Sequence, residues 1–195
     1  HAKDGDKYGI PGGKNPDGIK SATAQAIAGT VAIAAVVITA GGADKKLLDT
    51  LSNKAAPPVI LAGGGKAAEE AAEKIIEKAV AQGGAHAMED LAGAMAQRGV
   101  IGEYSVMAKF TKGLGARWQA HHILEVKFAK LFNLGATDRL PAVILSEAEH
   151  KAFTAKLAKA TAGVEDPKLL WEAYKKVYAG KDTWLKAIES YFVKP

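Results

Sequence analysis

The chain contains no cysteine among its 195 residues. This absence excludes disulfides, thiolate metal sites and cysteine nucleophiles, and it leaves His, Asp and Glu as ligands for any transition metal. Histidine and aromatic residues are also scarce, with five histidines and 7% Phe, Trp and Tyr. Because 48% of the residues are hydrophobic and many of these are alanine, the composition is typical of a folded soluble protein with a mostly helical core.

Positive charge is concentrated in the C-terminal half of the chain. The net charge is +5 overall. From Tyr104 onward there are 15 Lys and Arg against 9 Asp and Glu, which gives +6, whereas residues 1–103 hold 11 against 12, which gives −1. A basic C-terminal half suits a polyanionic partner such as nucleic acid, although many soluble domains are equally basic.

The first part of the chain has two segments of unusual composition. Residues 1–20 are rich in Gly, Pro, Asp and Lys and lack an initiator Met, which predicts a flexible linker in a chain excised from a longer one. Residues 21–43 contain no charge and are long enough to span a bilayer as a helix. Their Thr, Gln, Ala and Gly content favours a buried helix instead, so we expect no stable membrane insertion.

Three glycines and a lysine, residues 63–66, precede a predicted helix. They do not match a phosphate-binding loop, because G-x-x-x-x-G-K-[ST] requires a hydroxyl after the lysine and Lys66 is followed by Ala67. We predict a helix from Lys66 to about Gln82 and a second helix within residues 85–99. Residues 21–103 are therefore expected to form a helical, Ala/Gly-rich region before a module at 104–195.

The C-terminal half contains two predicted strands. The stretches GARWQAHHI (115–123) and LPAVILS (140–146) have the short apolar pattern of strands, and the second has a proline at its entry. Between them, residues 124–135 place apolar side chains at near-helical spacing and end at a glycine. The expected fold class is therefore α+β and mostly helical.

A capped helix follows the second strand. Ser146 with Glu149 three residues later forms a capping box, which predicts a helix start. In this helix His150, Phe153 and Leu157 share a face, so His150 lies one turn from the N-terminus on the apolar side. A single histidine on such a face is usually a core residue. The adjacent pair at 121 and 122, 28 residues earlier in a predicted strand, favours a site instead.

The run A-H-H-I from Ala120 to Ile123, with L-P-A-V-I-L-S-E-A-E-H from Leu140 to His150, resembles the HNH/endonuclease VII superfamily. The likeness is to the C-terminal toxin domains of bacterial polymorphic toxins, including Rhs-type and type VI secretion effectors. It covers residues 118–192, because LLWEAYKKVYAGKDTWLKAIESYF also resembles the segment after the motif in some of these toxins. The resemblance implies a ββα-metal (His-Me finger) nuclease core with flanking helices.

The resemblance also implies roles for the three histidines. By position, His121 is a ligand of one divalent cation (Mg²⁺, Zn²⁺ or Mn²⁺), His122 is the general base and His150 is the second ligand. The implied activity is hydrolysis of DNA phosphodiester bonds without strong sequence preference. Successive side chains of a strand point to opposite faces, so both histidines can approach one phosphate only if the strand ends or bulges at the pair.

The resemblance further implies partners and a place of action. Such a toxin is secreted or delivered by an Rhs or type VI carrier into a target bacterial cell, where it acts in the cytoplasm. A cognate immunity protein is expected, and an acidic one would complement the +6 module.

This sequence departs from the family pattern at two positions. The middle asparagine of the HNH signature has no clear counterpart, since Asn133 and Asp138 are both candidates and neither has the right spacing. In colicin-type nucleases another histidine follows four residues after the first helix histidine, and here that position is Thr154. Only two protein ligands then remain for the cation, with water and phosphate completing its coordination.

Basic and aromatic residues near the motif are candidates for substrate contacts. We expect Arg117 and Arg139 to contact phosphate, although single basic residues are usually solvated surface. Further basic candidates are Lys127, Lys130 and Lys151. The aromatic residues Trp171, Tyr174, Tyr178, Trp184, Tyr191 and Phe192 fit the core of two helices that begin at Asp166-Pro167 and Asp182, with a base-stacking platform as the alternative.

Three alternatives remain open from the sequence. The first is a membrane-active toxin that acts through residues 21–43. The second is a non-catalytic interaction module in which the histidine pair only packs or caps. The third keeps the nuclease site but has RNA as its substrate.

Overall fold

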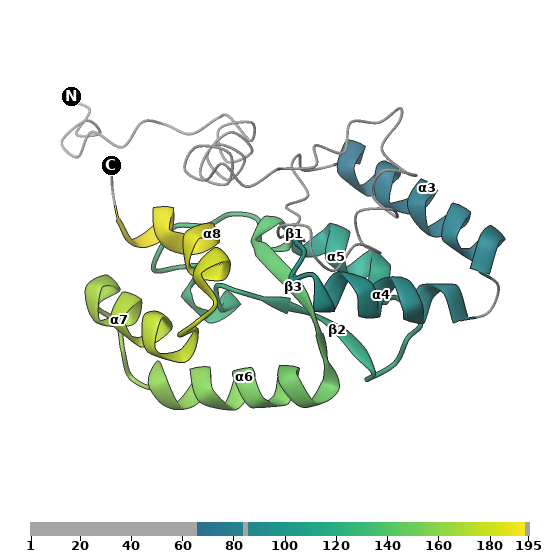
Figure 1. Ribbon diagram of the computed structural model, residues 1–195. Coiled ribbons are helices and arrows are strands. Elements are labelled where there is room, and N and C mark those ends of the chain that lie inside the picture. The colour runs from purple at the N-terminus through teal and green to yellow at the C-terminus, as the bar shows by residue number, and fades with distance from the viewer. Residues whose placement is uncertain (1–65, 84–85, 194–195) are drawn as a thin grey trace, which may run out of the picture.

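The computed structural model describes residues 66–83 and 86–193. In these ranges the chain is α+β and mostly helical, with a small antiparallel sheet (Figure 1). The helices are α3 (Lys66–Gly83), α4 (Ala87–Gln97), α5 (Tyr104–Thr111), α6 (Glu147–Ala160), α7 (Pro167–Val177) and α8 (Asp182–Phe192). The strands are β1 (Ile101–Glu103), β2 (Trp118–His122) and β3 (Pro141–Ser146). The expected fold class is thus confirmed at the level of α+β.

Several sequence predictions concern residues outside these ranges. The linker at 1–20, the uncharged segment at 21–43 and the glycines at 63–65 all lie outside the described residues. Of the helices in the described ranges, none combines the length and the apolar character needed to cross a membrane.

The sheet has the strand order β1-β3-β2, so β3 is central. On one side Gly102 of β1 pairs with Ala142, and on the other side His122 of β2 pairs with the same residue. Residues 141–145 are all buried, because helices cover both faces of β3. This central position explains why the sequence PAVILS is almost continuously apolar rather than alternating.

Alternate residues of β2 and β3 point into two separate hydrophobic cores. Ala142 and Ile144 belong to the core with α4 and α5, whereas Val143 and Leu145 belong to the core with α6, α7 and α8. Figure 1 shows these two groups of helices on different sides of the sheet. On β2, Trp118 and Ala120 face the first core. By the same alternation, His122 lies on the α5 side of the sheet and His121 on the α6 side.

The two helices predicted before the sheet are confirmed. α3 ends at Gly83, one residue after its predicted end, and α4 buries Leu91 and Met95. The boundary between the helical region and the module was expected between residues 103 and 104. Elements on both sides of this position pack against one another. β1 ends at Glu103 and pairs with β3, and residues of α3 and α4 share a core with α5 and β3. Residues of α3, α4 and β1 therefore pack together with α5 and β3.

The segment 124–135 does not form the helix that its spacing favours. It contains a single 3-10 turn, η2 (Val126–Phe128), and a turn at Asn133, whose φ is 52°. Val126 and Leu131 are exposed, so two of the apolar positions do not lie on a buried face. Without a continuous apolar face against the core, a short helix has little to stabilise it.

The helices after the sheet begin where the sequence predicts. At the start of α6 the Ser146 side chain accepts from the backbone N–H of Glu149, and the Glu149 carboxylate accepts from the backbone N–H of Ser146. α7 begins after Asp166, which accepts from the backbone of the next turn, and α8 begins at Asp182. The capping box fixes where α6 starts and therefore where His150 lies.

The aromatic residues of α7, of α8 and of the turn between them pack in the core. Tyr174, Tyr178 and Trp184 are buried, and the remaining three, Trp171, Tyr191 and Phe192, are partly buried against the same cluster. The prediction of core packing is confirmed for these side chains.

Candidate functional site

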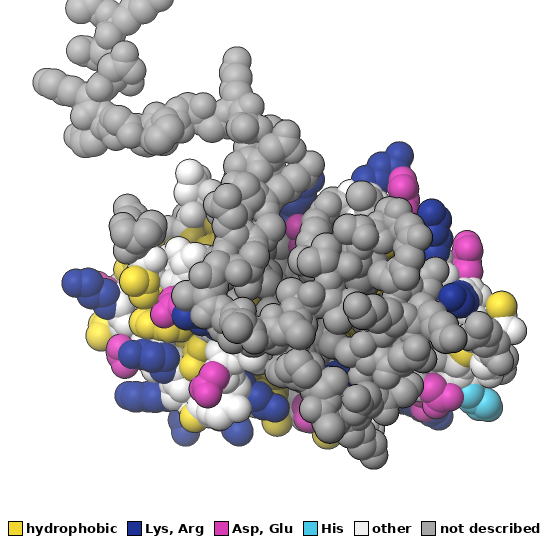
Figure 2. Space-filling view, turned by 45° about the horizontal axis from the view of Figure 1, so that its top comes forward, with side chains coloured by type: hydrophobic (Ala, Val, Ile, Leu, Met, Phe, Trp, Pro, Cys, Tyr) yellow, Lys and Arg dark blue, Asp and Glu magenta, His cyan; other side chains and the backbone are white. Residues whose placement is uncertain are grey.

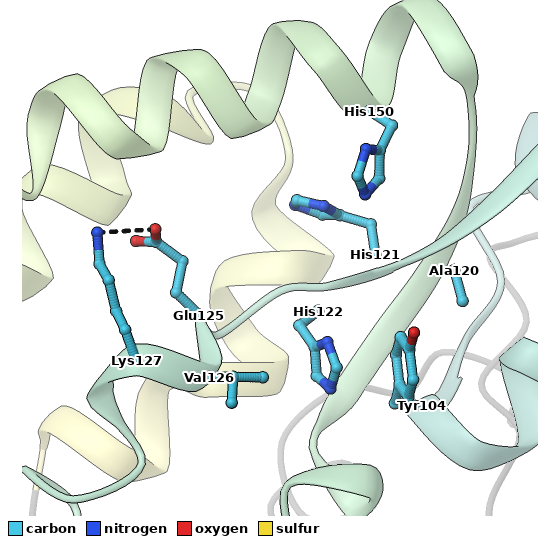
Figure 3. A pocket seen from close by; sticks show the side chains of 8 residues that line it. All are labelled: Tyr104, Ala120, His121, His122, Glu125, Val126, Lys127 and His150. Atoms are coloured by element: carbon cyan, nitrogen blue, oxygen red, sulfur yellow. Dashed lines mark ion pairs between the residues drawn. The ribbon is translucent and has the colours of Figure 1, made fainter. Parts of the chain in front are cut away.

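Three of the five histidines of the chain line one pocket at the end of β2. The pocket has a volume of about 330 Å³. It is lined by Tyr104, Ala120, His121, His122, Glu125, Val126, Lys127 and His150 (Figure 3). These residues come from α5, β2, the segment after β2, and the first turn of α6. The fold therefore brings His150 to the histidine pair, as the sequence predicts.

The end of β2 allows two adjacent histidines to border the same pocket. β2 ends at His122, and the next residue, Ile123, donates its backbone N–H to the carbonyl of Pro141. The ring of His121 lies against His150 of α6, and the ring of His122 lies against Tyr104 of α5 (Figure 3). The two histidines point to opposite faces, as the alternation of a strand requires, and the pocket opens where the strand stops.

His122 is held from two sides. Its ring stacks on that of Tyr104, with 3.8 Å between the centroids and 12° between the planes. Its Nε2 lies 3.1 Å from the carbonyl oxygen of Thr137. A carbonyl oxygen can only accept a hydrogen bond, so Nε2 carries the hydrogen and Nδ1 of the neutral ring carries the lone pair. This arrangement fixes both the orientation of the ring and its basic nitrogen.

His121 and His150 form a second pair of rings. Their centroids are 5.1 Å apart and their planes are nearly perpendicular, at 89°. His121 is only 6% exposed, and its Nε2 lies 3.4 Å from the hydroxyl of Tyr178. His150 is half-buried on the first turn of α6. The two imidazoles thus meet between β2 and α6.

Burial lowers the pKa of all three histidines. For His121, burial is the largest cause of the lowered pKa. Together with the charges of His150 and His122, it lowers the pKa of His121 to about 4. For His122 burial lowers the pKa, and the hydrogen bond to Thr137 opposes this shift. For His150 burial is the cause. At neutral pH the three rings are therefore neutral, and each retains a nitrogen lone pair for a proton or a cation.

The lowered pKa of His121 predicts a loss of stability in mild acid. Because its pKa falls from 6.5 to about 4 on folding, the unfolded chain binds the proton more readily as the pH drops through this window. Between pH 7 and pH 5 this one group should reduce the free energy of unfolding by about 2 kcal/mol. Urea denaturation at the two pH values, in EDTA, measures the loss.

The variant His121→Leu should lack this contribution and lose about 2 kcal/mol less over the same interval. His86→Ala is the matched control, since His86 is an exposed histidine before α4. If wild type and His121→Leu lost the same free energy of unfolding between pH 7 and pH 5, this would contradict a lowered pKa of His121.

His121 and His150 are the pocket residues that could hold a cation, because their two imidazole rings lie against each other. Among residues 66–83 and 86–193, no cluster of three or more His, Cys, Asp or Glu side chains is arranged to hold a metal. Two imidazoles suit zinc or another transition metal better than Mg²⁺, which prefers oxygen ligands. A cation held by two histidines keeps coordination positions for water and phosphate, as catalytic sites require.

A network of polar side chains borders the pocket beside the histidines. The carboxylate of Glu125 accepts from the hydroxyls of Tyr174 and Thr161 at 3.2 and 3.1 Å, and it pairs with Lys127 at 3.0 Å. Lys127 also donates to Thr161 at 2.7 Å. Since these groups satisfy one another, they hold the segment after β2 in place. Sequence reasoning did not find Glu125, because its partners lie 36 and 49 residues away.

The structure does not bring the two predicted arginines to the pocket. Arg117 precedes β2 at the end opposite the histidines, and its guanidinium pairs with Glu89 at 2.5 Å. Arg139 is half-buried in the 3-10 turn η3 (Thr137–Arg139), two residues after the carbonyl that binds His122. On the face drawn in Figure 2, Lys and Arg side chains are interspersed with Asp and Glu rather than gathered in one patch. Of the predicted basic residues, Lys127 lines the pocket.

Neither candidate for the HNH asparagine lines the pocket. Asn133 and Asp138 are both exposed, in the turn after η2 and in η3. Thr154, at the position of the missing third histidine, is also exposed. The pocket therefore has no counterpart of these two family positions.

Tyr104, which stacks on His122, is a second pocket residue that the sequence did not predict. It follows β1 directly, and its backbone N–H donates to the carbonyl of Leu140 at 3.0 Å. β1 and β2 flank β3, with Glu103 opposite Pro141 and His122 opposite Ala142. Tyr104 meets His122 through this register, for which the sequence has no local signal.

Comparisons with known proteins do not identify the chain: no protein-family model, curated protein or solved structure matches it. The chemistry of the pocket follows from the side chains that line it.

Proposed function

We propose that this chain contains a metal-dependent endonuclease of the ββα-metal type, which hydrolyses DNA phosphodiester bonds without strong sequence preference. One observation carries the proposal. His121, His122 and His150 line a single pocket, and the Thr137 carbonyl leaves Nδ1 of His122 as a free base. A base beside a pair of neutral imidazoles is the combination that metal-assisted hydrolysis of a phosphodiester needs.

The order of elements around the pocket supports this type of core. β2 and β3 are antiparallel, and α6 follows β3 directly and packs against the sheet. The histidine pair ends β2, and His150 lies on the first turn of α6. This is the strand-strand-helix order that the resemblance implies.

His122 is the proposed general base. Burial keeps its pKa below the usual value, so the ring is neutral at pH 7 and accepts a proton. The stacked ring of Tyr104 and the Thr137 carbonyl restrict its rotation, and the Nε2–H···O bond also stabilises the imidazolium that forms. These contacts orient the base before substrate arrives.

Hydrolysis follows from the position of this base. Nδ1 of His122 takes a proton from a water molecule, whose oxygen bonds to phosphorus as the bond from phosphorus to the leaving ester oxygen breaks. The leaving oxygen takes a proton from solvent, and His122 then releases its own proton to solvent. His121 and His150 would hold the divalent cation, which when bound supplies positive charge to the phosphate and the leaving oxygen.

The proposal includes the biological setting that the resemblance implies. The chain would be delivered by an Rhs or type VI secretion carrier into a target bacterial cell and act on DNA in the cytoplasm. A cognate immunity protein would block it, and the +6 charge from Tyr104 onward favours an acidic partner.

Cleavage of supercoiled plasmid by the purified chain tests the activity. With Mg²⁺, Mn²⁺ or Zn²⁺ we expect nicked, linear and then fragmented DNA, and we expect EDTA to abolish cleavage until metal is restored. A single-stranded RNA of similar length is incubated in parallel. If only the RNA is cleaved, RNA replaces DNA as the proposed substrate. Intact DNA and RNA with every metal would overturn the nuclease proposal.

A further inference from the structure

Tyr178, directly after α7, contacts the segment of β2 that carries the histidine pair. Its hydroxyl lies 2.9 Å from the carbonyl oxygen of Ile123 and 3.4 Å from Nε2 of His121. A tyrosine hydroxyl carries one proton at neutral pH, and a carbonyl oxygen can only accept. The proton of Tyr178 is therefore donated to Ile123, and the hydroxyl oxygen remains as an acceptor.

The direction of the Tyr178 hydrogen bond determines which nitrogen of His121 carries hydrogen. Nε2 faces an oxygen whose proton is already used, so Nε2 must donate. Nδ1 then holds the lone pair of the neutral imidazole. A histidine binds a metal through its unprotonated nitrogen, and the bond made by the other nitrogen selects that tautomer.

The tyrosine ring has little freedom to change this arrangement. It is fully buried and lies against Phe153 of α6, Trp184 of α8 and Tyr174 of α7, with centroids 5.7, 5.2 and 5.8 Å away. Rings from three helices therefore enclose it. In a close-packed interior the hydroxyl has no route to another partner.

Tyr174 makes a parallel contact without touching His121. It lies one helical turn earlier, accepts from the backbone N–H of Glu125 at 2.9 Å and donates to the Glu125 carboxylate at 3.2 Å. Tyr174 of α7 thus bonds to Glu125, whereas Tyr178, directly after α7, bonds to Ile123 and His121. Tyr174 is for this reason a matched control.

We propose that Tyr178 is a positioning residue that fixes the Nε2–H tautomer of His121, so that Nδ1 is offered, together with His150, to a divalent cation. The inference rests on the proposed function, since the cation is the one that the nuclease would use. It also explains why a C-terminal segment remote from the histidines in sequence belongs to the site.

The tautomer is measured in metal-free protein labelled with ¹⁵N, at pH 7. Two-bond ¹H–¹⁵N correlations distinguish the protonated ring nitrogen from the one with the lone pair. We expect the Nε2–H form alone for His121 in wild type and in Tyr174→Phe, and a mixture of both tautomers in Tyr178→Phe. An Nδ1–H form in wild type overturns the proposal, and this result stands even if Tyr178→Phe does not fold.

Cation affinity is measured by calorimetric titration of the apo proteins with Zn²⁺. Loss of a residue that orients a metal ligand typically weakens binding about 10- to 100-fold, and we expect this loss in Tyr178→Phe. Tyr174→Phe should bind Zn²⁺ like wild type. Equal affinities in wild type and a folded Tyr178→Phe would overturn the role in cation binding. If wild type binds no Zn²⁺, the cation site of the proposed function fails, while the tautomer still decides what Tyr178 does to His121.

Discussion

Replacement of His122 by alanine is expected to reduce the rate of plasmid cleavage by about 10²- to 10⁴-fold, the usual contribution of a positioned general base. Nδ1 of His122 is the free basic nitrogen at the end of β2, because Nε2 donates to Thr137. The ring is half-buried and stacks on Tyr104, so its loss should change the fold little. Initial rates of nicking at saturating Mn²⁺ or Zn²⁺ measure the effect.

The control for this substitution is His86→Ala, a change at an exposed histidine before α4 and away from the pocket. It should cleave like wild type. Circular dichroism and urea midpoints of both variants establish that they are folded. A folded His122→Ala that retains more than about a tenth of the wild-type rate would show that this histidine is not the base.

Replacement of His150 by alanine should remove both divalent-cation binding and cleavage. Loss of a mere supporting residue near a metal costs about 10- to 100-fold in affinity, and loss of one of two ligands should exceed that range. His150 lies on the first turn of α6, whose start is fixed by the Ser146 capping box, so the helix should form without it. Calorimetric titration with Zn²⁺ measures affinity, and the plasmid assay measures the rate.

Lys159→Ala, on the exposed last turn of the same helix, controls for changes to α6. It should retain both cation binding and cleavage. The comparison with His122→Ala separates the two roles, because His122→Ala should still bind Zn²⁺ while cleaving poorly. Wild-type Zn²⁺ affinity in His150→Ala would contradict a role for His150 as a ligand.

Local sequence patterns determined much of the secondary structure. The apolar run at 140–146 became the central strand, and Ser146 with Glu149 started α6. The helices at α3, α4, α7 and α8 also follow their predicted starts or spacing. Such signals succeed because capping groups and apolar periodicity act within a few residues of the chain, where sequence and structure correspond directly.

The sequence alone also indicated His121, His122 and His150 as candidate site residues. Two adjacent histidines in a predicted strand, followed by a histidine in a predicted helix, form a recognisable pattern. It did not predict the single 3-10 turn of residues 124–135, where the apolar spacing suggested a helix. Nor did it predict that Arg117 would lie at the far end of β2, paired with Glu89. The spacing of apolar residues does not show which of them a neighbouring helix or strand will bury.

The tertiary structure alone decided which groups surround the histidines. Tyr104 reaches His122 because β1 and β2 flank β3 in one register, and Tyr178 reaches His121 across 57 residues. Glu125 likewise finds its partners in α7 and at the end of α6. Burial in this fold lowers the pKa of the three histidines, and the Thr137 carbonyl selects the tautomer of His122. The contacts around the histidines depend on strand register and helix packing. Both are properties of the whole folded chain, so the residues nearby in sequence do not predict them.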